Sequence, residues 1–205
     1  MKFFNNPAKN LYGVLSVILG ITLALFTVQV VLFITSIIKG DPLPSSYAFP
    51  VNIFMTNNHY LSNGAKDIYV GNISGQILFF NPSILLQLYS GFYAIIIWAA
   101  VSYIIFLIRK IIRSIIEGNP FIKENGMRLR RTGIVLILVN IVLWISRLLV
   151  ANPAVTGIKI DNVKLSATGF SETFYISLGA GMFLIVLSEV FRIGTSLKEE
   201  NELTV

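Results

Sequence analysis

Two ionisable side chains interrupt otherwise apolar runs, which makes them the first candidates for chemistry. Arg147 is the only charged residue in Thr132–Ala151, and Glu189 is the only one in Thr173–Phe191. A charged group within a membrane is costly, and such groups often mark functional sites. A buried ion pair between the two would therefore point to a proton or ion pathway.

The positions of these residues along their helices argue against such a pair. At 1.5 Å per residue, Arg147 lies about 24 Å beyond Arg131, and Glu189 lies about 25 Å beyond Glu172. The two helices start from opposite membrane faces, so we expect each charge to reach its own nearer interface. Arg192 stands one turn after Glu189, a spacing that favours an ion pair.

A second hypothesis joins three polar residues of similar predicted depth. Gln29 and Gln87 fall near the same outer face as Arg147. Together they could form a polar cluster that senses or binds something arriving from outside. The alternative is that Gln29 and Gln87 hydrogen-bond to neighbouring helices and hold them together.

The sequence gives little support for catalysis. His59 is the only histidine and there is no cysteine, so we predict no metal site and no cofactor. No nucleophile elbow and no phosphate-binding loop occurs, and basic residues are not interleaved with aromatic ones as in base-stacking proteins. We therefore expect neither an enzyme nor a protein that binds nucleic acid directly.

Composition indicates what positions these residues. The 205 residues are 55% hydrophobic and 13% charged, whereas soluble domains carry about 25% charged residues. Four apolar runs approach or exceed the roughly 20 residues that cross a bilayer as a helix. The predicted spans are residues 11–38, 83–108, 132–151 and 173–191, which make one all-α membrane domain over residues 1–205.

Basic residues predict the orientation of the spans. If both termini and the central loop share a side, that side holds eleven Lys and Arg residues and the opposite side holds four. Because Lys and Arg collect on the cytoplasmic side, we expect both termini inside a bacterial cytoplasmic membrane. The cytoplasmic parts are then the loop 109–131 and the tail 192–205, and the extracytoplasmic parts are 41–82 and 152–172.

The extracytoplasmic segments carry strand patterns. Asp67–Val70 and Gln76–Phe80 flank the turn-rich Gly71–Gly75, and Ile158–Leu165 alternates around Asp161-Asn162 in the manner of a hairpin. A lone hairpin is only marginally stable. The two segments are therefore predicted to combine into one small β-rich extracytoplasmic cap.

Four Asn-Pro pairs lie near predicted helix boundaries. Asn6-Pro7, Asn81-Pro82 and Asn119-Pro120 are predicted to start helices, because Asn caps well and Pro suits the first turn. Asn152-Pro153 falls just past the third span. Asn140, near the middle of that span, is expected to hydrogen-bond to another helix.

The central loop has two possible roles. Residues 109–117 form a basic amphipathic helix that could anchor to anionic lipid headgroups. Alternatively, the loop could dock a cytoplasmic partner. The tail favours the second role: Ser196 and Glu199 have capping-box spacing after Gly194, and the end Leu203-Thr204-Val205 is of a kind that a groove can capture.

Residue motifs in the loop and tail resemble a bacterial family of four-span membrane proteins. The motifs are Glu117-Gly-Asn-Pro-Phe121, Asn125, Arg128-Leu-Arg130 and Gly133, with Phe191-Arg-Ile-Gly194, Leu197 and Glu202–Val205 near the end. The family is catalogued as domain of unknown function number 2975, and its members are often encoded beside a Cro-type helix-turn-helix regulator. The resemblance implies a partner rather than a reaction. Carried over by position, the partner-binding residues would be Gly118, Pro120, Phe121, Asn125, Arg128, Arg130, Leu203, Thr204 and Val205.

The sequence therefore predicts a regulatory or signal-sensing membrane protein coupled to a cytoplasmic DNA-binding regulator. The alternative is a small transporter or channel component. That alternative requires a continuous polar path with charges at the midplane, and Asn140 is the main polar residue available there.

Overall fold

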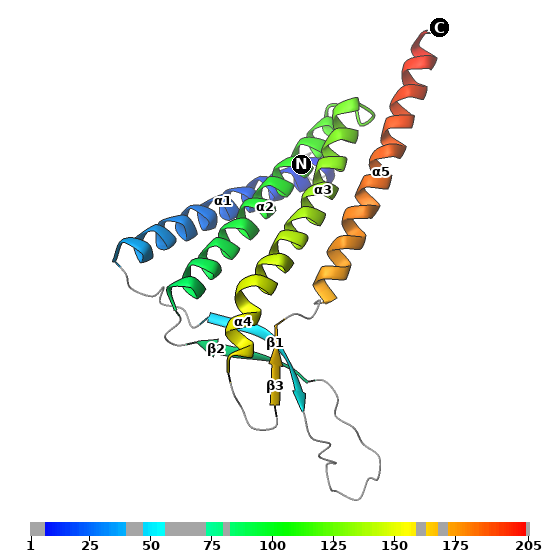
Figure 1. The fold of residues 1–205 in the computed structure, drawn as a ribbon. Coiled ribbons are helices and arrows are strands. Elements are labelled where there is room, and N and C mark those ends of the chain that lie inside the picture. Colours follow the sequence, from blue (N-terminus) through cyan, green and yellow to red (C-terminus); the bar gives the residue numbers. More distant parts are fainter. Residues whose placement is uncertain are drawn as a thin grey trace, which may run out of the picture. The chain divides into compact units, whose positions relative to one another are not determined.

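The computed structural model describes residues 7–39, 47–55, 73–79, 83–158, 163–167 and 172–203, and Figure 1 traces their elements. The chain folds into two compact units. One, here the helical unit, comprises Met1–Val31, Ala94–Ile141 and Glu172–Val205. The other, here the mixed unit, comprises Leu32–Tyr93 and Val142–Ser171.

The described residues include four helices long and apolar enough to cross a membrane. These are α1 (Pro7–Lys39), α2 (Ile84–Ile116), the continuous stretch Lys123–Thr156 that begins with α3 (Lys123–Ser146), and α5 (Glu172–Leu203). The helix starts follow local chemistry: α1 begins at Pro7, and the Ser83 hydroxyl accepts a hydrogen bond from the Leu86 amide of α2.

The outward faces of these helices are apolar. Val17 on α1 is 63% exposed, and Phe183 on α5 is 65% exposed. Large apolar side chains are exposed along all four helices. Soluble monomers rarely expose continuous apolar surface on this scale. The protein is therefore a membrane protein by composition and by surface.

The mixed unit holds a three-stranded antiparallel sheet in the order β2-β1-β3. β1 (Tyr47–Met55) pairs with β2 (Ile73–Phe79) from Tyr47↔Phe79 to Ile53↔Ile73. On its other edge, β1 pairs with β3 (Val163–Ser166) only over Asn52–Met55. Pro50 therefore lies where β1 has a partner on one side alone, which is where a strand tolerates a residue without an amide hydrogen.

The sheet corrects two details of the sequence analysis. Ile73–Gly75, predicted as a turn, belongs to β2, and the predicted strand Gln76–Phe80 forms its second half as far as Phe79. The predicted strand pattern Ile158–Leu165 is confirmed only in β3, which pairs with β1 of the other predicted extracytoplasmic segment. Ile158 instead follows α4, and its amide donates to the Val155 carbonyl. Asp67–Val70 and the turn Asp161-Asn162 lie outside the described residues.

A small core joins the sheet to helix ends within the mixed unit. The buried side chains come from α2, from the end of the third helix and from β3 with its following residue: Leu86, Ala151, Val155, Leu165 and Ala167. Ile53 of β1 packs against them. The Asn152 side chain also accepts the Ala167 amide at 3.1 Å, which fastens the chain after β3 to the helix.

The third helix does not end at Ala151 as predicted. It continues through a π-helical turn, Arg147–Ala151, and through α4 (Asn152–Thr156), with the Asn152 amide donating to the Arg147 carbonyl. Pro153 cannot donate a helical hydrogen bond of its own. A π turn just before it shifts the register of the hydrogen bonds, so the helix continues past the proline.

α5 likewise continues where a break was expected. The helix runs unbroken from Glu172 to Leu203, so Ser196 and Glu199 lie inside it and do not cap a new helix. Gly194 is held in the helix by packing, because a Cβ there would lie 3.2 Å from the Phe121 ring. Tertiary contact has overridden the local tendency of glycine to end a helix.

Candidate functional site

The connection between α2 and α3 is a tightly specified turn in the helical unit. Gly118 has φ 80°, its amide donates to the Ile115 carbonyl at 3.1 Å, and the Asn119 amide donates to the Ser114 carbonyl at 3.0 Å. This pair of hydrogen bonds around a left-handed residue is a Schellman motif, in which glycine is favoured. Gly118 is thus required by the turn itself.

Asn125 holds the turn to both helices. Its side chain is fully buried. The amide nitrogen donates to the Ser114 hydroxyl and, at 2.8 Å, to the Pro120 carbonyl, while the amide oxygen accepts from Arg128 at 2.7 Å. Arg128 also donates to the Lys110 carbonyl of α2 at 3.2 Å. Asn125 and Arg128 therefore position the connection.

Glycines bring α3 and α5 close together. A Cβ on Gly133 would lie 2.5 Å from the Gly181 carbonyl oxygen, and a Cβ on Gly181 would lie 2.7 Å from Ile137. Small residues permit such close backbone approach between membrane helices. Nearer the connection, the rings of Phe121 and Phe191 pack with their centroids 5.5 Å apart. The two helices are thus fixed at two levels.

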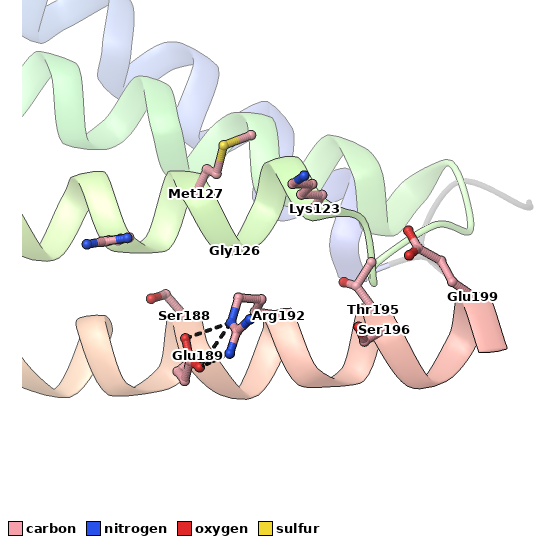
Figure 2. Close-up of a pocket in the computed structure, with 10 residues that line it drawn as sticks. Lys123, Gly126, Met127, Ser188, Glu189, Arg192, Thr195, Ser196 and Glu199 are labelled. Carbon is pink, nitrogen blue, oxygen red and sulfur yellow. Dashed lines mark hydrogen bonds and ion pairs between the residues drawn. The ribbon is translucent and has the colours of Figure 1, made fainter.

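Between these helices lies a groove of about 280 Å³ that is lined mainly by polar and charged residues, which we call the α3–α5 groove. Its α3 wall carries Lys123 and Met127, and its α5 wall carries Glu189, Arg192 and Glu199 (Figure 2). Arg130 also belongs to the α3 wall. The remaining lining residues are Gly126, Ser188, Thr195 and Ser196. Charged side chains of both helices thus line one groove, in contrast to the exposed apolar side chains elsewhere on α3 and α5.

Some charged side chains of the α3–α5 groove form a salt bridge and others do not. Arg192 donates to Glu189 at 3.0 Å, the ion pair that the i,i+3 spacing predicted (Figure 2). Both side chains are more than half exposed, so the pair adds little stability. Lys123 and Arg130 have no ion-pair partner in the described part of the chain. The groove therefore offers two cations and the thioether of Met127 to a ligand.

The groove lies within the part of the chain that a family model recognises. Residues 69–205 match the family described as "Protein of unknown function (DUF2975)". The chain belongs to the DUF2975 family. No curated protein and no solved structure matches it. The matched region holds the Gly118 turn and Asn125 as well as both walls of the groove, whereas α1 and β1 precede it.

The residues of the α2–α3 connection and early α3 that were predicted to bind a partner differ in accessibility in this DUF2975 protein. Asn125 is buried, whereas Phe121 is 45% exposed and Arg130 is exposed on the groove wall. Leu203 is the last helical residue of α5, and Thr204 and Val205 lie outside the described residues. Partner binding by the predicted residues stays a prediction. Of these residues, Arg130 lines the α3–α5 groove.

The three residues of the predicted polar cluster in this DUF2975 chain are divided between the units. Gln29 belongs to the helical unit, and Gln87 and Arg147 belong to the mixed unit. The side chains of Arg147 and Ser146 hydrogen-bond to the Tyr89 hydroxyl of α2. Arg147 also begins the π-helical turn, a feature often found at functional sites. The three-residue cluster stays a prediction, and Tyr89 is the contact that sequence reasoning missed.

Two further expectations concern single residues. Asn140 donates to the Leu136 carbonyl of its own helix at 2.7 Å, and its expected bond to another helix stays a prediction. Among the described residues no group of His, Asp and Glu could hold a metal ion. His59 lies outside them.

Most of the groove escaped the sequence analysis. Glu189 and Arg192 were considered as an ion pair near the interface, Ser196 and Glu199 only as a helix cap, and Lys123 and Met127 were not singled out. The available signal was spacing: polar residues recur at intervals of three and four from Glu189 to Glu199, and Lys123 and Arg130 stand two helical turns apart. Two such stripes on neighbouring helices indicate a shared polar face.

Proposed function

We propose that this chain is an integral protein of the bacterial cytoplasmic membrane with both termini inside. The four long apolar helices and the eleven-to-four distribution of basic residues support this orientation. The sheet strands join helix ends that are outside in this arrangement, so the sheet would form the extracytoplasmic cap. The α2–α3 connection and the α3–α5 groove then face the cytoplasm.

In this orientation the protein acts as a membrane-bound docking site for a cytoplasmic regulator. The observation that carries the proposal is the α3–α5 groove. It combines two cations that form no salt bridge with any described residue, Lys123 and Arg130, with an exposed methionine, Met127. Methionine is favoured at adaptable binding surfaces because its side chain is flexible and polarizable.

The chemistry of the groove suits an acidic segment of the partner that also presents an apolar side chain. A carboxylate would lie against Lys123 and Arg130, and the apolar group would contact Met127. The family resemblance indicates a small helix-turn-helix regulator of the Cro type as that partner. Holding such a regulator at the membrane would keep it from its DNA, and a signal at the cap would have to bias two states of the protein.

The test measures binding of the regulator to the whole protein. The full chain in lipid nanodiscs is titrated with a purified helix-turn-helix regulator of the Cro type. Arg130→Glu should weaken binding about tenfold, since a reversed contact of about 1.4 kcal/mol has that effect. Arg131→Glu is the matched control, because Arg131 is the next residue, is also exposed and does not line the groove. Equal binding by both variants would contradict the proposal.

A further inference from the structure

A second pocket of the helical unit lies between α1 and α2. It has a volume of about 140 Å³ and is lined by Tyr12, Phe106, Arg109, Lys110 and Arg113. Arg109 donates to the Tyr12 hydroxyl at 2.9 Å, and its guanidinium carbon lies 4.9 Å from the centre of the Tyr12 ring. An arginine held by an aromatic ring on the neighbouring helix has a fixed position.

The charges of this pocket are mostly uncompensated. Arg113 is paired with Glu117 at 2.8 Å, outside the lining. The Lys110 ammonium lies 4.4 Å from the centre of the Phe106 ring, and neither Lys110 nor Arg109 has an acidic partner in the described ranges. No carboxylate among the described residues lines the pocket. It is therefore suited to a compact anion.

An apolar groove continues from the same place. It has a volume of about 320 Å³, and its walls are Leu19, Leu23 and Phe26 of α1 with Ala99, Ser102, Tyr103 and Phe106 of α2. Phe106 lines both the groove and the basic pocket. From Tyr12 to Phe26 the helix rises about 21 Å, which covers a headgroup and one leaflet of about 15 Å.

One polar group in the apolar groove is unsatisfied. Ser102 is 6% exposed, and its hydroxyl has no hydrogen-bond partner among the described residues. Several other helix serines donate to a carbonyl three or four residues earlier, as Ser114 does to Ile111 at 2.7 Å and Ser16 to Tyr12 at 2.7 Å. A buried hydroxyl without a partner costs free energy, and a ligand oxygen in the groove would accept its hydrogen bond.

We propose that an anionic glycerophospholipid binds between α1 and α2. Its phosphate accepts hydrogen bonds from Arg109 and Lys110, and one acyl chain lies in the groove from Phe106 towards Phe26. A zwitterionic lipid is disfavoured because the lining offers no carboxylate for its cationic group. The site is independent of the α3–α5 groove, and its α1 wall lies outside the family-matched region.

The test uses the full chain in detergent with fluorescent lipids. Phosphatidylglycerol should bind at least about fivefold more tightly than phosphatidylcholine. Substituting both Arg109→Gln and Lys110→Gln should weaken phosphatidylglycerol binding about 25-fold, from about 1 kcal/mol for each cation. Arg131→Gln with Lys198→Gln removes the same charge elsewhere and should leave the affinity unchanged.

A second variant and a soluble competitor separate the two halves of the site. Ala99→Phe fills the apolar groove and keeps every charge, so it should weaken lipid binding on its own. Glycerol phosphate carries the headgroup chemistry without acyl chains and should compete only weakly. Equal affinity for the two lipids, full competition by glycerol phosphate, or equal effects of the two charge-removing double variants would each overturn the proposal.

Discussion

Adding one methyl group at Gly133 tests whether α3 and α5 approach as closely as the geometry requires. In a helix interior, glycine to alanine is ordinarily stabilising by roughly 0.5–1 kcal/mol. At Gly133 the new Cβ would lie 2.5 Å from the Gly181 carbonyl oxygen, whereas ordinary contact begins at 3.4 Å. The backbones must therefore separate by about 0.9 Å. Overpacking of this kind costs about 1–3 kcal/mol, so Gly133→Ala should be destabilising.

Gly179→Ala is the matched control, because a Cβ at Gly179 meets nothing within 4 Å. The assay is thermal unfolding of both variants in detergent, followed by tryptophan fluorescence and circular dichroism. With a shift of about 2–4 °C per kcal/mol for a chain of this size, Gly133→Ala should lower Tm and Gly179→Ala should raise it slightly. Shifts of the same sign would refute the close approach, and with it the geometry of the α3–α5 groove.

Three further predictions concern substitutions in the α2–α3 connection and the α3–α5 groove. Asn125→Ala removes three side-chain hydrogen bonds and should lower the free energy of unfolding in detergent by about 2–4 kcal/mol. The control Asn140→Ala loses one hydrogen bond within its own helix and should lower it by about 1 kcal/mol or less. Gly118→Ala should cost about 1–2 kcal/mol because φ is 80°, and Gly118→Asn should recover part of that loss; equal Tm values for the two would contradict the left-handed assignment. Glu189→Gln breaks an exposed ion pair and should change stability by less than about 1 kcal/mol, so a larger loss would show that the pair is structural.

The long helices could be predicted because composition alone specifies them. Leu11–Ile38 carries no charge, and a run of that length can satisfy its backbone in a membrane only as a helix. Helix ends depend on tertiary contacts and were less predictable. The π turn at Arg147 accommodates Pro153, which by itself predicts a helix end, and the continuity of α5 through Gly194 depends on packing against Phe121.

The sheet and the groove also depend on tertiary contacts that local sequence patterns do not predict. β1 was missed because Pro50 and Asn52 interrupt its apolar pattern, and its pairing with β3 crosses more than 100 residues of sequence. Asn125 and Gly118 were singled out by motif, but their structural task became visible only with their hydrogen bonds. Lys123 and Met127 had no motif to mark them, so the groove required the neighbouring helix to be in place.

Site-specific crosslinking in living cells tests the docking account most directly. A photoreactive phenylalanine analogue replaces Met127, which lines the α3–α5 groove and is 43% exposed, or Met182 of α5, which is 59% exposed and lies outside the groove. The account predicts an adduct with the helix-turn-helix regulator at Met127 and none at Met182. Equal crosslinking at both positions, or none at Met127 when both proteins are present, would contradict it.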